Sequence, residues 1–193
     1  AIHEKYGPLT SCLTNVGTGM RISFMMHLPA IVMFKATDGI FSAISKLGLT
    51  VRGMYGEGTK SAGHLFQISN QVTLGKDENE IINDITNVVE GIISKEKELR
   101  QELLNQKGLV LEDKIMRSLG TLQNARIMQS KEMMALLSDV RLGISLGLIK
   151  DISIKKITSL MIMASRAHIS SSETSDAPFE RDVERAKLIR NTL

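Results

Sequence analysis

The stretch Cys-Leu-Thr-Asn-Val-Gly-Thr-Gly-Met-Arg at residues 12–21 decides how the rest of the chain is interpreted. It places a thiol, a glycine turn and a guanidinium group close together. Gly17 and Gly19 let backbone amides approach phosphate oxygens, and Arg21 offers a fork of donors for the same oxygens. The stretch predicts an anion site of the nucleotide type. The motifs GxGxxG and GxxxxGK[ST] do not occur, and the glycines by themselves are more often an ordinary turn.

The composition narrows the class of protein. The chain has 193 residues, of which 42% are hydrophobic and 23% charged, as in a globular protein. Its single cysteine excludes an internal disulfide, and no apolar run approaches the roughly 20 residues that span a membrane. Residues 1–75 carry six Lys/Arg against three Asp/Glu, whereas the remaining residues carry eighteen of each. We expect a cytoplasmic protein that binds an anion, with neither a membrane nor direct nucleic acid as partner.

The first 75 residues have the pattern of a small sheet. Strands are expected over four β-compatible segments, Leu9–Thr14, Arg21–Leu28, Thr50–Met54 and His64–Ser69. Between the second and third segments, Thr37 or Asp38 is suited to cap a helix that runs through Leu47. Gly48 then stands at the position that ends such a helix.

From Asp77 onward the pattern is helical. Asp77 and Glu80 form a capping-box pair, and apolar residues then recur at helical spacing to about Gln106. Three further helices are expected, over Glu112–Ile127, Ser130–Gly147 and Ser153–Ala164, before a polar linker at Ser170–Pro178 and a charged segment at Glu180–Leu193. Strands followed by helices, without regular alternation, predict an α+β fold.

A second glycine-rich stretch, from Arg52 to Lys60, follows the third expected strand and contains one carboxylate, Glu57. A carboxylate on a loop that closes over a ligand is a candidate base or cation clamp, and Arg52 is a second candidate for phosphate contact. Solvated charge is the simpler interpretation of such a loop. Cys12 is likewise either an ordinary thiol or a stabilised thiolate.

The charged segment at the end of the sequence contains paired arginines. Arg181 and Arg185, with Asp182 between them, place two guanidinium groups one helical turn apart. This pairing suits a phosphorylated ligand, although a salt-bridged helix end has the same pattern. The four histidines lack the spacing of metal ligands, so no metal held by protein side chains is expected.

Taken in order, several of these motifs resemble one enzyme family, the ATP:guanidino phosphotransferases. The matching positions are Cys12, Thr14, Asn15, Gly17, Thr18, Gly19 and Arg21, then Arg52 and Gly53, Ser69 and Asn70, and Leu74 and Gly75. Within the family the chain is most similar to the bacterial protein-arginine kinases. The features that indicate this are Glu57, the segment Ser138–Gly143 and the segment Arg181–Ala186.

The resemblance implies a catalytic set and a mechanism. Arg21 and Arg52 would hold the phosphates of ATP, Cys12 would contact the substrate guanidinium as a thiolate, and Glu57 would orient or deprotonate it. Mg²⁺ would be held mainly by the nucleotide phosphates. The reaction implied is phosphorylation of arginine side chains in proteins, which marks those proteins for a Clp-type protease.

The resemblance also implies an architecture and partners. An antiparallel sheet flanked by helices would form the catalytic-domain portion at residues 1–150. A helical extension at 151–193 would hold phosphoarginine in an allosteric pocket made by Arg181, Asp182 and Arg185. The partners implied are proteins with exposed arginines, an activator protein and a Clp unfoldase, and a homodimer is expected.

Three departures from the family pattern matter. Leu13 replaces the proline that usually follows the cysteine, and Met25 stands where many relatives have an adenine-contacting histidine. The family's N-terminal portion, with further phosphate-binding arginines, is expected upstream of these residues, so the 193 residues alone are expected to lack part of the catalytic set. Two alternatives stay open: a non-catalytic adaptor that binds phosphoarginine, and an arginine kinase acting on the free amino acid.

Overall fold

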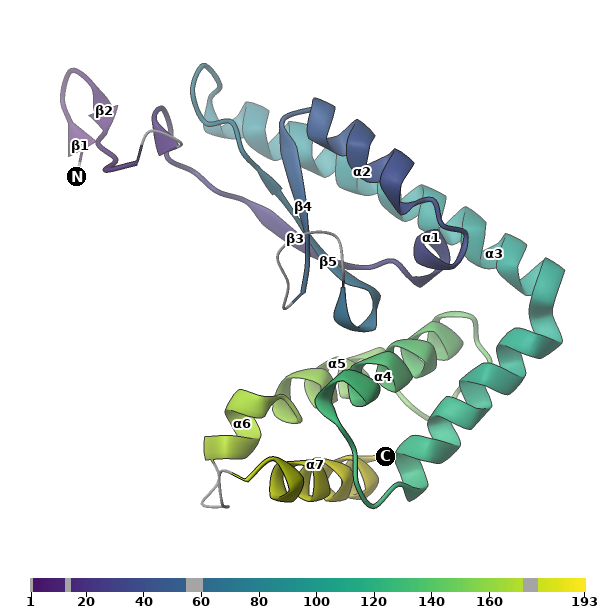
Figure 1. The fold of residues 1–193 in the computed structure, drawn as a ribbon. Coiled ribbons are helices and arrows are strands. Elements are labelled where there is room, and N and C mark those ends of the chain that lie inside the picture. The colour runs from purple at the N-terminus through teal and green to yellow at the C-terminus, as the bar shows by residue number, and fades with distance from the viewer. Residues whose placement is uncertain (1, 13–14, 55–60, 172–176) are drawn as a thin grey trace. The chain divides into compact units, whose positions relative to one another are not determined.

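The computed structural model describes residues 2–12, 15–54, 61–171 and 177–193 (Figure 1). By its internal contacts the chain forms two compact units. Unit 1 comprises Ala1–Ser61 and Leu65–Leu99, and unit 2 comprises Ala62–His64 and Arg100–Leu193. The expected division at residue 150 falls inside unit 2, between two of its helices. As a division by function it stays a prediction.

Unit 1 is built around a three-stranded antiparallel sheet in the order β3-β5-β4. Its strands are β3 (Ser23–His27), β4 (Leu49–Gly53) and β5 (Leu65–Asn70), and a separate ribbon pairs β1 (Ile2–His3) with β2 (Gly7–Pro8). Its helices are α1 (Pro29–Met33), α2 (Thr37–Lys46) and the first part of α3 (Glu78–Asn124). An antiparallel sheet with helices was expected, and the α+β prediction is confirmed.

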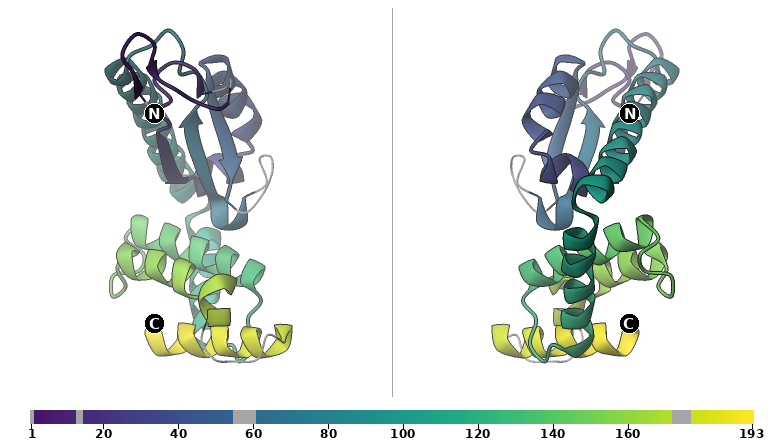
Figure 2. Two further views of the ribbon diagram at one scale, coloured as in Figure 1. Left: turned by 90° about the vertical axis from the view of Figure 1, so that its left-hand side faces the viewer. Right: turned by 90° about the vertical axis from the view of Figure 1, so that its right-hand side faces the viewer.

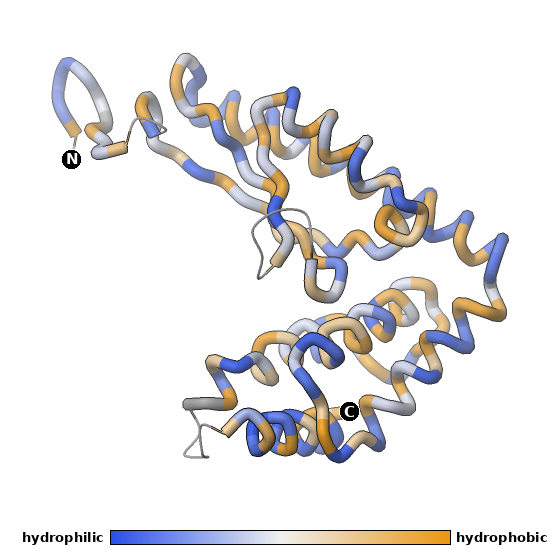
Figure 3. Tube along the Cα trace, viewed as in Figure 1, coloured by the Kyte–Doolittle hydropathy of each residue, from blue (hydrophilic) through white to orange (hydrophobic). Residues whose placement is uncertain are grey.

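One face of the sheet forms the core of unit 1. Period-2 alternation turns Met26, Phe66 and Ile68 to this face, where all three are buried. They pack in one cluster with residues of α2 and α3, which include Phe41, Ile44, Ile85, Val89 and Ile92. Figure 2 shows α2 and the first part of α3 beside the strands, and in Figure 3 apolar and polar residues alternate along both helices. The opposite face of the sheet has no such cover from these helices.

Unit 2 is helical. It contains the second part of α3, α4 (Ser130–Ser145), α5 (Ile154–Met163), α6 (Arg166–Ser171), α7 (Pro178–Thr192) and the short 3₁₀ turn η2 (Ala62–His64). Its buried core includes Ile115, Leu122, Met133, Leu137, Val140, Ile157 and Leu160. The turn η2 packs on α4, although its neighbours along the chain, Ser61 and Leu65, belong to unit 1.

Local sequence signals explain most element ends. Asp77 and Glu80 form the expected capping box, with Glu80 N–H donating to Asp77 Oδ1 at 2.8 Å and Asp77 N–H donating to Glu80 Oε2 at 3.0 Å. Gly48 takes φ +76° after α2, as a helix-ending glycine does. Ser153 caps α5 by accepting from the N–H of Lys156.

Two expectations about elements need correction. Residues 9–12 form no strand, because the carbonyl of Cys12 accepts from Asn15 N–H and closes a turn; Leu13 and Thr14 lie outside the described residues. The N-cap of α2 is Ala36, so Thr37 and Asp38 are already helical. The two helices expected on either side of residues 107–111 are confirmed, because Lys107 leaves helical geometry within α3, at φ −137° and ψ 28°, and divides it into two parts.

Candidate active site

The polar face of the three-stranded sheet gathers the residues expected to bind phosphate. Because side chains alternate along a strand, the face opposite the core receives Ser23 and Met25 from β3, Gln67 and Ser69 from β5, and Thr50 and Arg52 from β4. Arg21, two residues before β3, joins them, since its Nη2 donates to Ser69 Oγ at 3.2 Å. The strand register thus brings together two arginines that are 31 positions apart in the sequence.

Arg21 and Arg52 both line one cavity of about 370 Å³. Its other lining residues are Asn15, Met20, Asn70, Gln71 and Thr73. Both arginines are exposed. Guanidinium groups at the wall of an open cavity, next to amide and hydroxyl side chains, suit an anion with several oxygens, because each group can donate two parallel hydrogen bonds.

Asn70 holds the segment that carries Arg21. Its Oδ1 accepts from Ile22 N–H at 2.8 Å, and its Nδ2 donates to the carbonyl of Met20 at 2.9 Å. These two bonds lie on either side of Arg21, so they fix the backbone from which the guanidinium extends. The sequence singled out Asn70 only as part of the family resemblance, because its partners lie about 50 residues earlier in the chain.

The glycine turn packs against the loop that follows β5. Gly17 has φ +106°, and a Cβ at this position would lie 2.1 Å from the carbonyl oxygen of Thr73. The Thr18 amide donates to that same oxygen at 3.2 Å, and Thr73 Oγ1 donates to the carbonyl of Val16 at 2.8 Å. The Met20 amide donates to Thr18 Oγ1. The amides of Thr18 and Met20 are therefore used inside the protein, and the approach of other amides of the turn to phosphate stays a prediction.

Cys12, one of the two residues expected to act in catalysis, does not line this cavity. Cys12 is exposed and its carbonyl accepts from Thr10 Oγ1 and Asn15 N–H, but it is not among the residues that line the cavity. Glu57 lies outside the described residues, as does Leu13. Met25 lies on the polar face, opposite Gln67, and is 54% exposed. The roles of these residues stay predictions.

The paired arginines of the last segment lie on α7, and both are buried. Arg185 is 2% exposed; its Nε donates to the carbonyl of Ala164 at 2.9 Å and its Nη1 to the carbonyl of Met128 at 2.7 Å. The same Nη1 is paired with Asp182. Arg185 thus fastens α7 to the end of α5 and to the segment before α4. A phosphoarginine pocket at these residues stays a prediction.

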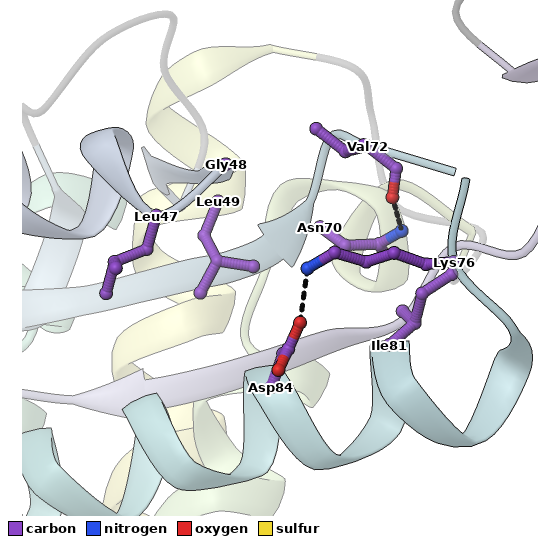
Figure 4. Close-up of a pocket in the computed structure, with 8 residues that line it drawn as sticks. All are labelled: Leu47, Gly48, Leu49, Asn70, Val72, Lys76, Ile81 and Asp84. Carbon is purple, nitrogen blue, oxygen red and sulfur yellow. Dashed lines mark hydrogen bonds and ion pairs between the residues drawn. The ribbon is translucent and has the colours of Figure 1, made fainter. Parts of the chain in front are cut away.

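A second cavity lies beside Asn70 and is smaller, about 70 Å³ (Figure 4). It is lined by Leu47, Gly48, Leu49, Asn70, Val72, Lys76, Ile81 and Asp84. Figure 4 shows the ammonium group of Lys76 pointing to the carboxylate of Asp84, with which it is paired. Since the charge of Lys76 is already balanced and the walls are largely apolar, this cavity suits an anionic ligand less well than the one at Arg21 and Arg52.

Residues 2–12, 15–54, 61–171 and 177–193 contain neither a cluster of metal ligands nor a membrane-spanning helix. In these ranges no three His, Cys, Asp or Glu side chains gather where they could hold a metal ion. Within the same ranges no helix combines the length and the apolar character that crossing a bilayer requires.

Comparison with known proteins shows the family of the chain. The family described as "ATP:guanido phosphotransferase, C-terminal catalytic domain" matches residues 1–99, the part that contains the sheet and both arginines. The chain belongs to the ATP:guanido phosphotransferase family. A second family, described as "Protein-arginine kinase McsB C-terminal domain", matches residues 108–193. The resemblance inferred from the motifs is confirmed.

Among curated proteins, this member of the ATP:guanido phosphotransferase family is similar to several named "Protein-arginine kinase". It is 50% identical to that of Geobacillus kaustophilus (strain HTA426), over 100% of this chain and 53% of the relative. It is 47% identical to that of Bacillus subtilis (strain 168), again over 100% and 53%, and 47% identical to that of Pelotomaculum thermopropionicum over 98% and 54%. The chain spans about half the length of the curated relatives it matches.

The two family matches follow the structure of the chain. The first match ends at residue 99, where unit 1 ends, and the second begins at residue 108, directly after the break in α3 at Lys107. In this member of the ATP:guanido phosphotransferase family, the sheet with Arg21 and Arg52 thus falls in one match and the helices with Arg185 in the other.

Proposed function

We propose that the chain is part of a protein-arginine kinase, which transfers the terminal phosphoryl group of ATP to arginine side chains of proteins. The observation that carries the proposal is the meeting of Arg21 and Arg52 at one cavity on the polar face of the sheet. Family membership supplies the reaction type, and the names of the relatives supply the class of substrate.

The two arginines suit the role that phosphoryl transfer requires. The reaction needs alignment and stabilisation of negative charge rather than covalent help from the protein. Arg21 and Arg52 would bind the phosphate oxygens, and Asn70 would keep the first of them in place through its bonds on both sides. Bound Mg²⁺ would neutralise further charge on the nucleotide.

The acceptor needs a different kind of help. A guanidinium is protonated at neutral pH, so one of its nitrogens attacks phosphorus only if a neighbouring group takes or repositions a proton. As the N–P bond forms, the bond from phosphorus to the leaving oxygen of ADP breaks. We assign the proton to Glu57, with Cys12 as a thiolate beside the guanidinium, from the family resemblance.

The wider role follows the same resemblance. We propose a cytoplasmic, homodimeric enzyme whose phosphorylated products enter Clp-type proteolysis, with an activator protein and a Clp unfoldase as partners. Allosteric sensing of phosphoarginine at Arg181, Asp182 and Arg185 belongs to this proposal. The alternative, a non-catalytic adaptor, depends on the same arginines. Calorimetry with phosphoarginine separates the adaptor from a plain structural tail, and formation of phosphoarginine from ATP separates the kinase from the adaptor.

The test is Arg52→Ala in the full-length gene product, assayed with Mg-ATP and an arginine-rich protein by mass spectrometry for acid-labile phosphoarginine. We expect kcat/KM to fall about a hundredfold, as when one charge-stabilising donor is removed from an active site. Arg52→Lys keeps the charge but loses the fork of donors, so its kcat/KM should lie between those of Arg52→Ala and wild type.

Arg117→Ala is the matched control, because this guanidinium lies on α3 with 79% of its side chain exposed and is paired with the neighbouring Asp113. It should retain wild-type activity. If Arg52→Ala is as active as wild type, Arg52 does not bind phosphate. If the full-length wild type forms no phosphoarginine, the proposed function itself is wrong.

A further inference from the structure

The turn η2 belongs to the helical unit and directly precedes β5 in the chain. The chain leaves unit 1 after Ser61, contributes Ala62–His64 to unit 2, and returns to unit 1 at Leu65. Leu65 is the first residue of β5, whose later positions pair with Arg52 and support Arg21. The residue that directly precedes the strand at the phosphate site is therefore packed in unit 2.

The backbone of η2 is held in an uncommon conformation. Gly63 has φ +63° and His64 has φ +55°, so two successive residues are left-handed. A left-handed residue other than glycine is disfavoured by steric contact of its Cβ, and it persists only where its surroundings enforce it. Residues held in this way often lie at functional sites.

Both residues of the turn are enforced by one face of α4. A Cβ on Gly63 would lie 2.7 Å from the carbonyl oxygen of Met134, so the turn packs directly on the helix backbone. His64 Nδ1 lies 2.9 Å from Ser138 Oγ in a hydrogen bond. Met134 and Ser138 are four residues apart and share a helix face. Ser138 is fully buried, so its hydroxyl serves no solvent contact.

The contact continues into the rest of unit 2. Asp139, the neighbour of Ser138, is 6% exposed and accepts from Lys114 Nζ at 2.7 Å and from Ser118 Oγ at 3.0 Å, both on α3. A series of polar side chains thus runs from η2 through α4 to α3. The segment Ser138–Gly143 had been singled out only as a family-like motif, and the structure gives its first two residues this role.

We propose that His64 is a positioning residue for the phosphate site, acting through Ser138 of α4, so that the helical unit controls the rate of phosphoryl transfer through the start of β5. This deepens the proposed function and rests on it for its activity readout. Unlike the arginines, His64 is not expected to touch nucleotide or substrate. Its effect should appear in kcat with little change in the KM for ATP.

The test compares His64→Asn, Ser138→Ala and the double variant in the full-length protein. Asparagine tolerates a left-handed backbone but is too short to replace the imidazole. Each single variant should lower kcat about five- to tenfold, and the double variant should lower it no further than the worse single, because coupled residues are non-additive. Ser145→Ala, an exposed serine on the same helix, is the control and should match wild type.

A readout without catalysis separates this proposal from the proposed function. Hydrogen–deuterium exchange should speed up in β5 from Leu65 onward in Ser138→Ala, with no change in Ser145→Ala. Single variants with wild-type kcat would overturn the proposal. A double variant whose fold-loss in kcat equals the product of the two single losses would overturn it as well. If the wild type forms no phosphoarginine, the proposed function fails, and the exchange experiment alone decides: unchanged β5 exchange then overturns the role of His64.

Discussion

Gly17 is the residue whose identity is most strictly set by its neighbours. It combines φ +106° with a position so close to Thr73 that a Cβ would lie 2.1 Å from the Thr73 carbonyl oxygen. Backbone cannot yield as the end of a flexible side chain can. The glycine of the motif is therefore explained first by packing of the turn on the loop after β5, and only through that packing by the position of Arg21.

We predict that Gly17→Ala destabilises unit 1 by about 3 kcal/mol, since it adds both a disfavoured backbone conformation and a steric overlap. Gly75→Ala is the matched comparison, because Gly75 has φ +79° but a Cβ added there would meet nothing within 4 Å. That variant should cost only about 1 kcal/mol, the conformational part. Urea unfolding followed by circular dichroism measures both, and equal losses would show that packing against Thr73 has no effect.

At the scale of elements, α1 and α3 are joined by a buried carboxylate. Glu96 of α3 is 3% exposed, and its two oxygens accept from the amides of Ala30 and Ile31, at 3.1 and 3.0 Å. The N-cap residue of α1, Leu28, has no side-chain cap of its own. A side chain 65 residues away in the sequence therefore supplies the cap that the local sequence lacks.

We predict that Glu96→Gln lowers the free energy of unfolding of unit 1 by about 1.5–3 kcal/mol, because a charge-assisted pair of hydrogen bonds is replaced at a buried site. Glu98→Gln, on the same helix but 63% exposed in its side chain and paired with Lys95, should change stability by less than about 0.5 kcal/mol. Denaturant unfolding at neutral pH compares the two. A loss no larger for Glu96 than for Glu98 would contradict the capping role.

The contact between η2 and α4 should make the stability of unit 2 depend on pH. Burial lowers the pKa of His64 below its ordinary value of 6.5, the nearby Asp139 carboxylate opposes this shift, and Lys114 adds to it. Because the unfolded chain then binds the proton more readily than the folded one, the stability from neutral His64 is complete above the unfolded pKa. It is lost as pH falls through 6.5 toward the folded pKa.

We therefore predict a fall in the stability of unit 2 between about pH 7 and pH 5, and a shallower fall in His64→Asn. Thermal unfolding across this range measures the difference. Substitution of the exposed His3 serves as control, since it lies in β1 of unit 1. Identical slopes for His64→Asn and wild type would show that His64 titrates alike in the folded and unfolded chains.

At the scale of the whole molecule, each unit has its own core and its own contacts that hold its elements together. The core of unit 1 lies between the sheet and helices α2 and α3, whereas unit 2 depends on helix contacts closed by α7. Arg185 is central to that closure, because one buried guanidinium satisfies the carbonyls of Met128 and Ala164 and pairs with Asp182. Met128 N–H also donates to the carbonyl of Asp182 at 3.0 Å.

We predict that Arg185→Met destabilises unit 2 by about 3–5 kcal/mol, because it leaves Asp182 and two buried carbonyls without their donor. Arg190→Met is the comparison on the same helix; Arg190 is only part-buried and donates to the carbonyl of Ala125, so its loss should be smaller. Amide exchange should increase in α7 and α5 and stay unchanged in β3–β5. An Arg185→Met protein that keeps wild-type stability but no longer binds phosphoarginine would instead make Arg185 a ligand-binding residue.

The sequence alone determined what depends on residues a few positions apart. The capping box of Asp77 and Glu80, the helix-ending Gly48 and the apolar spacing of α4 and α5 are local, so most helices could be predicted from them. The three strands of the sheet could be predicted from their β-compatible segments. The motif around Arg21 sufficed to indicate the family. It did not indicate which amides the turn uses, because Thr73 lies more than 50 residues further on.

Only the tertiary structure decided which distant residues meet. The register of β3, β5 and β4 put Arg21 and Arg52 on one face, Asn70 closed on the segment before β3, and Glu96 capped a helix from another part of the chain. The bond from His64 to Ser138 spans 74 positions. Such contacts carry no local signal, because a side chain that bonds across the fold has the same neighbours in sequence as one that faces water. Folding buries Asn70, Glu96 and Ser138 away from water, so each needs a hydrogen-bond partner inside the protein.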